Sequence, residues 1–275
     1  MIALIYLAHI AVLTFGAVTL VWLISLAMKD ASIIDIFWGL GFALVGAACL
    51  WLANRASGGA INPYLWLMGL MPILWGLRLT AYLAKRNLGH GEDGRYVAMR
   101  KRSGLAEMTW RLRALFTIYW GQGLLILVVS APVWIAFAMG RETEIGLLAV
   151  IGAVMWLAGT LFEAIGDAQL AAFLRRHADY DGPYEDKPVL DTGLWRYTRH
   201  PNYFGNALLW WGIFIVACQA PMGWVSIFGP VIMTILLMRV SGRDLLERKL
   251  KKRPAYRDYV ERTSSFIPRP PKSSS

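Results

Sequence analysis

The stretch RYTRHPNYFG, from Arg196 to Gly205, gathers two arginines, a histidine and an asparagine just before the apolar run ALLWWGIFIVA. The first N–H groups of a helix lack intrahelical partners, and the helix dipole favours an anion there. Arg199, His200 and Asn202 therefore have the chemistry of a phosphate or carboxylate site. The alternative is a helix-entry motif, with Pro201 as an early helical residue and basic side chains at the membrane surface. Neither topology nor helix entry requires Asn202 or Tyr203.

A second polar stretch, FEAIGDAQLAAFLRR, contains Glu163, Asp167 and Gln169. Glu163 and Asp167 are four residues apart, so they share one face of a helix. Two neighbouring acids repel each other unless donors bond to both. A ribose or an ordered protein donor would serve.

Three further polar sites accompany apolar segments. Asp35, in SIIDIFWG, stands near the start of a predicted helix, where helix capping and a functional role both remain open. Arg78, in LWGLRLTAYLAKR, lies about two turns from a helix end, too deep for easy snorkelling, and we expect it to pair with an acid such as Asp35. For the loop GHGEDGRYVAMRKR we favour a solvated turn whose basic residues contact lipid headgroups.

The composition indicates a polytopic membrane protein. The chain is 57% hydrophobic and only 17% charged, and its mean hydropathy is +0.46, far from a soluble globular domain. Cys49 and Cys218 both lie in apolar runs, which favours buried small hydrophobes over a disulfide. The histidines are scattered without ligand spacing, so we expect no metal site.

Seven apolar stretches approach the length of about 20 residues that a membrane span requires. We predict an all-α protein with spans at 2–28, 32–53, 62–84, 114–138, 145–165, 203–219 and 222–239. The first stretch is too long for a secretory signal and has no basic region before it, so we expect it to be a retained helix.

The distribution of Lys and Arg predicts the topology, because basic loops stay cytoplasmic. Eight of the 28 fall between residues 85 and 113, five between 175 and 199 and eleven between 239 and 272, whereas the alternate loops hold one or none. This parity fits seven spans, with the N-terminus outside and the C-terminus in the cytoplasm. An anionic leaflet explains the net charge of +10, and we expect contact with membrane lipids, no nucleic acid and a monomer. A transporter is a further alternative, although no internal repeat is evident.

These motifs carry a resemblance. DTGLWRYTRHPNYFG followed by WWG, the tail YRDYVERTSSFIPRP and the elements DIFWG, LWGLRL and EDGRY resemble the membrane steroid 5-alpha-reductase family, in particular its bacterial 3-oxo-5-alpha-steroid 4-dehydrogenase-like members. The resemblance implies one seven-helix domain over residues 1–275, with its cofactor-binding half at about 145–270. It also implies a bacterial inner membrane and a cofactor site facing the cytoplasm. The implied reaction is NADPH-dependent reduction of the carbon–carbon double bond of a lipophilic enone from the bilayer, such as a 3-oxo-Δ4-steroid.

The resemblance also assigns roles. It implies Asp35, Trp75 and Arg78 as the catalytic group that polarises the ketone. Residues implied to surround the cofactor are Arg86, Arg95, Glu163, Asp167, Arg175, Arg176, Lys187, Arg199, His200, Asn202, Tyr203, Asn206, Tyr256 and Tyr259.

Two positions depart from the family pattern. Trp75 stands where the steroid enzymes have a tyrosine, and its indole N–H can still donate to a ketone. Asn206 replaces an acid that many relatives carry after NYFG, and its amide oxygen can still accept a hydrogen bond. No GxGxxG fingerprint follows a strand, so the cofactor cannot be held in the Rossmann manner.

The chemistry of the implied reaction requires preorganised donors. Hydride adds to the β carbon only if the developing enolate oxygen is stabilised by donors in a dry site. A carboxyl group at Asp35, kept protonated by burial, would supply such a donor. Asp35 would otherwise orient Trp75, Arg78 or Tyr119.

A second resemblance remains open. RHPNY, then LLERKL with Glu247, then the tyrosine-rich tail ending in FIP are similar to the membrane isoprenylcysteine and phospholipid methyltransferases, which bind S-adenosylmethionine. The elements DIFWG, LWGLRL and EDGRY and the pair Glu163 and Asp167 favour the reductase, because a methyltransferase site needs none of them.

Overall fold

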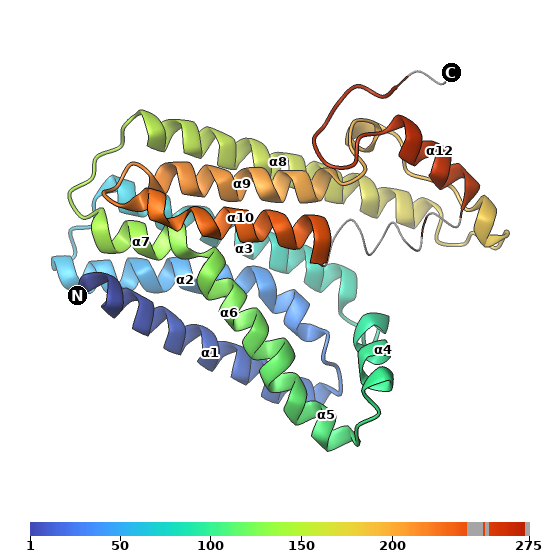
Figure 1. The fold of residues 1–275 in the computed structure, drawn as a ribbon, viewed down its shortest axis with the longest axis horizontal. Coiled ribbons are helices and arrows are strands. Elements are labelled where there is room, and N and C mark those ends of the chain that lie inside the picture. Colours follow the sequence, from blue (N-terminus) through green and yellow to red (C-terminus); the bar gives the residue numbers. More distant parts are fainter. Residues whose placement is uncertain (241–249, 251–252, 273–275) are drawn as a thin grey trace. The chain divides into compact units, whose positions relative to one another are not determined.

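Helices account for the regular structure of the chain, which a computed structural model describes over residues 1–240, 250 and 253–272. Those residues contain no strand, in agreement with the all-α prediction. Figure 1 shows the helices, which are α1 (Ile2–Met28), α2 (Ile33–Ser57), α3 (Pro63–Asn87), α4 (Gly94–Ser103), α5 (Glu107–Ala114), α6 (Trp120–Val129), α7 (Ala131–Met139), α8 (Leu147–Arg176), α9 (Pro201–Ala217), α10 (Phe228–Ile235) and α12 (Pro254–Arg262).

Five of these helical stretches are long and apolar enough to cross a membrane. They are α1, α2, α3, the continuous stretch Glu107–Val129 and α8, and they identify an integral membrane protein. Two predicted spans fall on shorter helices, since α9 has 17 residues and the last apolar helix covers Gly223–Arg239. Seven crossings and their orientation therefore stay a prediction.

The fourth predicted span, 114–138, is corrected by a break at Ser130. The helix starts earlier, at Glu107, continues through a π-helical turn (Leu115–Tyr119) and ends at Val129, and α7 follows as a separate helix. Pro132 has no N–H for the carbonyl of residue 128, and its ring crowds that carbonyl. A continuous helix is thus interrupted although the apolar run is not.

The chain divides into two compact units. Unit 1 comprises residues 1–149 and 214–229, and unit 2 comprises residues 150–213 and 230–275.

Unit 1 is built around the pair α2 and α3. Gly39 and Gly76 let the two backbones touch, because a Cβ on Gly39 would lie 2.5 Å from the carbonyl oxygen of Gly76. Small residues permit such close approach of membrane helices. Phe42 and Trp75 fill the interface beside them, with ring centroids 5.5 Å apart. Helices α1, α6 and α7 pack around the pair, and α4 joins α3 to α5 (Figure 1).

Unit 2 is built around α8 and α9. Gly159 and Gly205 bring the two helices together, because a Cβ on Gly205 would lie 2.6 Å from the carbonyl oxygen of Gly159 and 2.5 Å from the backbone nitrogen of Glu163. The C-terminal helix α12 is tied to the segment before α9, since the Tyr259 hydroxyl donates to the Trp195 carbonyl oxygen at 2.5 Å. Close backbone contact between two helices at paired glycines therefore occurs in both units.

Candidate functional site

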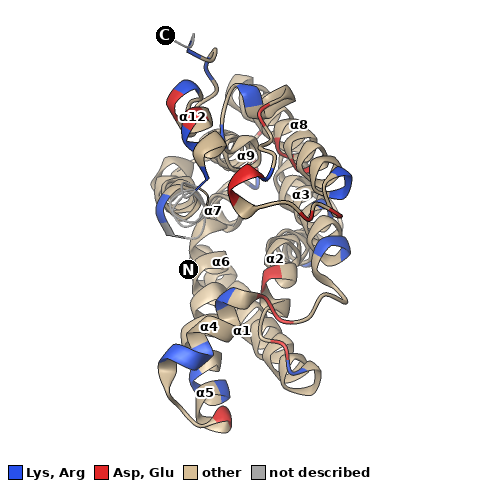
Figure 2. Ribbon diagram, turned by 90° about the vertical axis from the view of Figure 1, so that its right-hand side faces the viewer, with Lys and Arg blue, Asp and Glu red and all other residues tan. Residues whose placement is uncertain are grey.

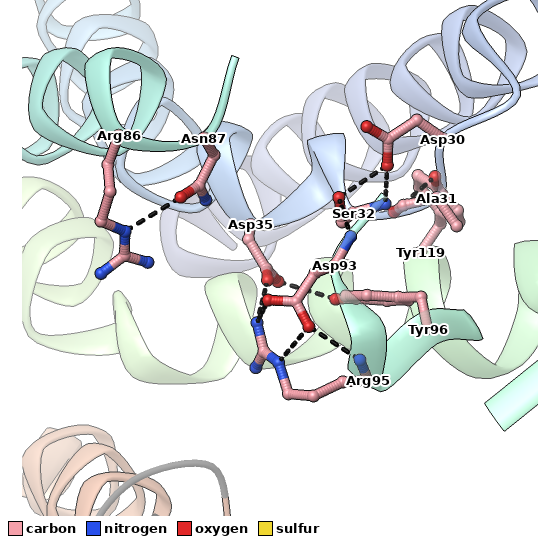
Figure 3. A network of polar contacts seen from close by, with 10 residues as sticks. All are labelled: Asp30, Ala31, Ser32, Asp35, Arg86, Asn87, Asp93, Arg95, Tyr96 and Tyr119. Carbon is pink, nitrogen blue, oxygen red and sulfur yellow. Dashed lines mark hydrogen bonds and ion pairs between the residues drawn. The ribbon is translucent and has the colours of Figure 1, made fainter. Parts of the chain in front are cut away.

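The first polar cluster, in unit 1, consists of Asp35, Asp93, Arg95 and Tyr96 and is called the Asp35 cluster. Asp35, in the first turn of α2, accepts hydrogen bonds from Arg95 Nη2 at 2.6 Å and from the Tyr96 hydroxyl at 2.7 Å (Figure 3). Arg95 also donates through Nε to Asp93 Oδ1 at 3.0 Å and through Nη2 to Asp93 Oδ2 at 3.2 Å. The four side chains form one continuous hydrogen-bonded chain.

Helix capping explains why Arg95 and Tyr96 reach Asp35. The Asp93 carboxylate accepts from the backbone N–H of Arg95 at 2.8 Å and so caps α4, which fixes where this helix begins. The Asp93 N–H donates to Ser32 Oγ at 3.2 Å, and Ser32 donates to Asp30 at 2.6 Å. The loop before α4 is thereby fastened to the turn before α2 (Figure 3).

An ion-pair network also connects the loop before α4 and α4 itself to α5. Glu92 accepts from the Ala31 N–H at 3.0 Å and pairs with Arg100. Arg100 also contacts Glu107 at 3.2 Å, and Glu107 accepts from Arg111 at 2.7 Å. These alternating charges hold α4 and α5 against the turn that follows α1.

Two groups of the Asp35 cluster have shifted pKa values. Burial, followed by the charge of Asp35 and the hydrogen bond to it, raises the pKa of Tyr96 above its ordinary value. Burial also opposes ionisation of Asp93, but hydrogen bonds from Arg95 and its charge outweigh burial and lower the pKa of Asp93. Tyr96 is therefore a neutral hydrogen-bond donor at neutral pH.

The predicted pair of Asp35 and Arg78 is not formed. The Asp35 oxygens accept from Arg95 and Tyr96, and the Arg78 guanidinium lies over the Tyr82 ring, 5.6 Å from its centroid. The fold of the loop before α4 brings Arg95 to Asp35, which sequence distance does not show. The Asp35 side chain is 21% exposed, and its oxygens accept these two hydrogen bonds. A donor role of Asp35 toward a ketone stays a prediction.

Two other predicted site residues of unit 1, Trp75 and Arg86, are not hydrogen-bonded to the Asp35 cluster. Trp75 is fully buried against Phe42. Arg86 donates through Nε to the side-chain oxygen of Asn87 at 2.9 Å, near the end of α3 (Figure 3).

The second polar cluster, in unit 2, is an acid–amide ladder of Glu163, Asp167, Asn202 and Asn206. Asn202 Nδ2 donates to Asp167 Oδ1 at 3.2 Å, and Asn206 Nδ2 donates to Glu163 Oε1 at 3.2 Å. The two acids are each only 3% exposed. The predicted requirement for donors to both acids is met by amides one helical turn apart on α9. Ionisable groups buried in a membrane-spanning helix are costly and mark functional sites.

Buried polar atoms without a hydrogen-bond partner lie on the same two helices. In the part of the chain that the structure describes, they include Asn206 Oδ1, Thr160 Oγ1 and Trp156 Nε1. Asn206 is 6% exposed. Such atoms are rare because they cost free energy, and each calls for a physical explanation. A polar ligand beside Asn206 would supply the missing partner of its Oδ1.

Arg199, the first predicted anion donor, holds the C-terminal helix. Its Nη1 donates to the carbonyl oxygens of Val260 at 3.0 Å and Thr263 at 2.5 Å, at the end of α12. The last carbonyl groups of a helix lack intrahelical partners, and a cation complements the dipole there. Its contact with a phosphate stays a prediction. His200 stacks on Tyr203, with ring centroids 5.2 Å apart and planes at 6°.

The remaining predicted cofactor residues of unit 2 divide into tyrosines and cations. Tyr256 and Tyr259 are buried on α12, with ring centroids 5.7 Å apart. Arg175 and Arg176 are exposed at the end of α8, and Lys187 is partly exposed. Among the described residues, none of these three cations has an ion-pair partner. They remain available to a phosphate.

Sequence reasoning missed Tyr96, Asp93 and Thr160. An aspartate directly before a helical segment is a capping signal, and applying it to EDGRY would have placed Asp93 at the start of a helix. Only the folded chain brings Tyr96 to Asp35. Nothing in the sequence singles out Thr160. Glu247, which the methyltransferase resemblance uses, lies outside the described residues.

Comparisons with known proteins find a family without an assigned activity. A family model described as a protein of unknown function (DUF1295) matches residues 21–263. An uncharacterized protein of Schizosaccharomyces pombe is 26% identical over 275 residues, covering 94% of this chain and 78% of the other. No solved structure matches the chain. Function must therefore be argued from the two polar clusters.

Proposed function

The chain belongs to the DUF1295 family, and we propose that it is an NADPH-dependent membrane reductase that saturates the carbon–carbon double bond of a lipophilic enone such as a 3-oxo-Δ4-steroid. The observation that supports this proposal best is the acid–amide ladder: two carboxylates, each 3% exposed, between apolar helices beside an amide oxygen without a partner. A buried cluster of this kind is the expected lining of a ligand site inside a membrane protein.

The residues of unit 2 fit the chemistry of a dinucleotide. Carboxylate and amide oxygens at Glu163, Asp167 and Asn206 are acceptors for ribose hydroxyls and for a carboxamide N–H. The exposed Arg175 and Arg176 and the partly exposed Lys187 suit the phosphates. Bound NADPH would supply the hydride, and the protein would supply binding, orientation and dryness.

The residues of the Asp35 cluster fit the second requirement of the reaction, which is stabilisation of the substrate's carbonyl oxygen. Hydride addition to the β carbon of an enone puts negative charge on the carbonyl oxygen, which a fixed donor must stabilise. The one hydroxyl proton of Tyr96 is donated to Asp35 at 2.7 Å. The donor to the carbonyl oxygen would therefore be the Arg95 guanidinium, which has five N–H groups and which Asp35 and Asp93 hold in place. A proton from water would then add to the α carbon, which completes the saturated ketone. Trp75 and Arg78 stay proposed as further donors to the substrate.

The proposed topology follows the basic loops. Seven spans with the N-terminus outside place residues 85–113 and the C-terminal tail in the cytoplasm, where a soluble cofactor is found. We place the protein in a bacterial inner membrane with its substrate arriving from the bilayer.

Binding of NADPH to the detergent-purified full chain tests the proposal. Titration calorimetry, with NADH and S-adenosylmethionine as competitors, should show saturable NADPH binding that NADH displaces only weakly. Asp167→Ala and Asn202→Ala should weaken it roughly tenfold or more, whereas Asn54→Ala, at an exposed position of α2 in unit 1, should bind as the unmodified protein does. Unchanged NADPH binding in both ladder variants would overturn the assignment, and binding of S-adenosylmethionine alone would favour the methyltransferase.

A further inference from the structure

The segment between α3 and α5 must lie at a membrane surface. The helix Pro63–Asn87 before it and the helical stretch Glu107–Val129 after it are both long and apolar enough to cross the membrane. Residues 88–106, which include α4, are thus confined to the level where two spans end. Helices at this level contact lipid headgroups and the outermost part of the acyl chains.

The structure separates the charges of this region into two classes. Residues 88–113 contain six basic and three acidic side chains. The three acids are all engaged by arginines of the same region: Asp93 by Arg95, Glu92 by Arg100, and Glu107 by Arg100 and Arg111.

The three other basic side chains of this region are Lys101, Arg102 and Arg113. Each is exposed, and within the described residues none has an acidic partner. Figure 2 shows the basic residues of α4 and α5 in blue. Pairing inside the region therefore leaves a surface with excess positive charge.

Exposed apolar side chains accompany these cations. Met99, on α4, is 43% exposed, and Met108, on α5, is 63% exposed. Met108, Leu112 and Phe116 follow at four-residue spacing, so they form one exposed stripe that runs from α5 toward the membrane-spanning part. Apolar residues beside free cations form the pattern of an interfacial surface that prefers anionic lipid.

We propose that α4 and α5 form a binding surface for phospholipids with a net negative headgroup. Lys101, Arg102 and Arg113 pair with headgroup phosphates, and Met99 and Met108 insert below the headgroups. Charge complementarity identifies the occupant, because a zwitterionic headgroup brings a repelling ammonium along with its phosphate. This inference holds whether or not the protein is a reductase.

Lipid selectivity of the full chain in phosphatidylcholine vesicles tests the proposal. Spin-labelled phosphatidylglycerol and spin-labelled phosphatidylcholine report, by their motionally restricted fraction, how strongly each lipid associates with the protein. Lys101→Gln/Arg102→Gln should reduce the preference for phosphatidylglycerol about twofold or more at low salt, since a basic residue near a membrane surface contributes significantly to attraction of anionic lipid. High salt should weaken the preference of the unmodified protein.

The matched control is Arg55→Gln/Arg141→Gln, which removes two exposed charges at the other ends of the helices of unit 1. This control and the charge-conserving variant Lys101→Arg/Arg102→Lys should both keep the full preference. Equal loss in the control would show a net-charge effect and overturn the proposed surface. Retained preference in Lys101→Gln/Arg102→Gln, or no preference in the unmodified protein, would also overturn it.

Discussion

The helix pairs α2/α3 and α8/α9 both pack closely at facing glycines, but different side chains line the rest of each interface. Gly39 faces Gly76 in the first pair, and Gly159 faces Gly205 in the second, so that backbone touches backbone in both. The α2/α3 interface continues with apolar rings such as Phe42 and Trp75, with the Thr80 hydroxyl beside Gly39, and Asp35 stands in the first turn of α2. The α8/α9 interface instead continues with buried acids and amides.

This difference shows which polar residues packing does not explain. Small residues permit close approach of membrane helices, and α2 and α3 approach closely at Gly39 and Gly76. The ladder residues of α8 and α9 add desolvation cost to an interface that is already close. Their place inside the pair is consistent with the ligand-binding role proposed for them.

The largest expected effect tests the glycine contacts that the two helix pairs share. Gly39→Ala and Gly205→Ala should each lower the free energy of unfolding by about 3 kcal/mol, because the new Cβ meets backbone atoms that cannot move aside. Unfolding in mixed micelles with increasing dodecyl sulfate measures the loss. Gly16→Ala is the control, since a Cβ there has nothing within 4 Å. Equal stability in all three variants would contradict close backbone packing.

The next effect tests the ladder. Asp167→Ala should weaken NADPH binding roughly tenfold to a hundredfold, as expected for loss of hydrogen bonds to a charged acceptor. Asp167→Asn keeps an acceptor and should lose less. Fluorescence titration of the bound nicotinamide checks both. Asp191→Ala, at a surface carboxylate paired with Arg262, should leave the affinity unchanged; a loss there equal to that of Asp167→Ala would argue against a specific ladder site.

A smaller effect separates anchoring from ligand binding at Arg199. Arg199→Ala should destabilise the docking of α12 by about 1.5 kcal/mol, because the carbonyls of Val260 and Thr263 lose a charged donor. Hydrogen exchange of residues 254–266 should then become faster, while that of α8 stays as it was. Arg199→Lys should restore part of the protection. Unchanged exchange in Arg199→Ala would show that the other contacts of α12 suffice.

The smallest effect concerns the pH dependence of the Asp35 cluster. The pKa of Tyr96 is raised, so the folded state holds its proton more tightly than the unfolded state does. The resulting stability is fully present below the ordinary tyrosine pKa of about 10 and is lost as pH rises above it. Tyr96→Phe should lower stability by about 1 kcal/mol near neutral pH and reduce its alkaline loss. Unfolding curves at pH 8 and pH 11, with Tyr82→Phe as the control, measure the difference.

Several features of the two clusters were accessible from sequence. The four-residue spacing of Glu163 and Asp167 predicted a shared face and a need for donors, and Asn206 and Asn202 fill that need. The apolar runs predicted helices at every place where a long one occurs. These predictions succeed because helical periodicity and membrane thickness act locally along the chain.

Other features required the folded chain. The pairing of Asp35 with Arg95 and Tyr96 depends on how the loop before α4 turns back, and the anchoring of α12 by Arg199 joins residues 61 and 64 apart in sequence. The break at Ser130 was readable in principle from Pro132, but the apolar run concealed it.

The sequence by itself determined that this chain is helical and embedded in a membrane, because apolar length and helical spacing are properties of consecutive residues. It also singled out candidate polar residues such as Glu163, Asp167 and Asn202. Only the tertiary structure decided which charges neutralise one another and which remain exposed, as at Arg100 and Lys101. Electrostatic pairing depends on distance in space, and chain neighbours on a helix surface point in different directions.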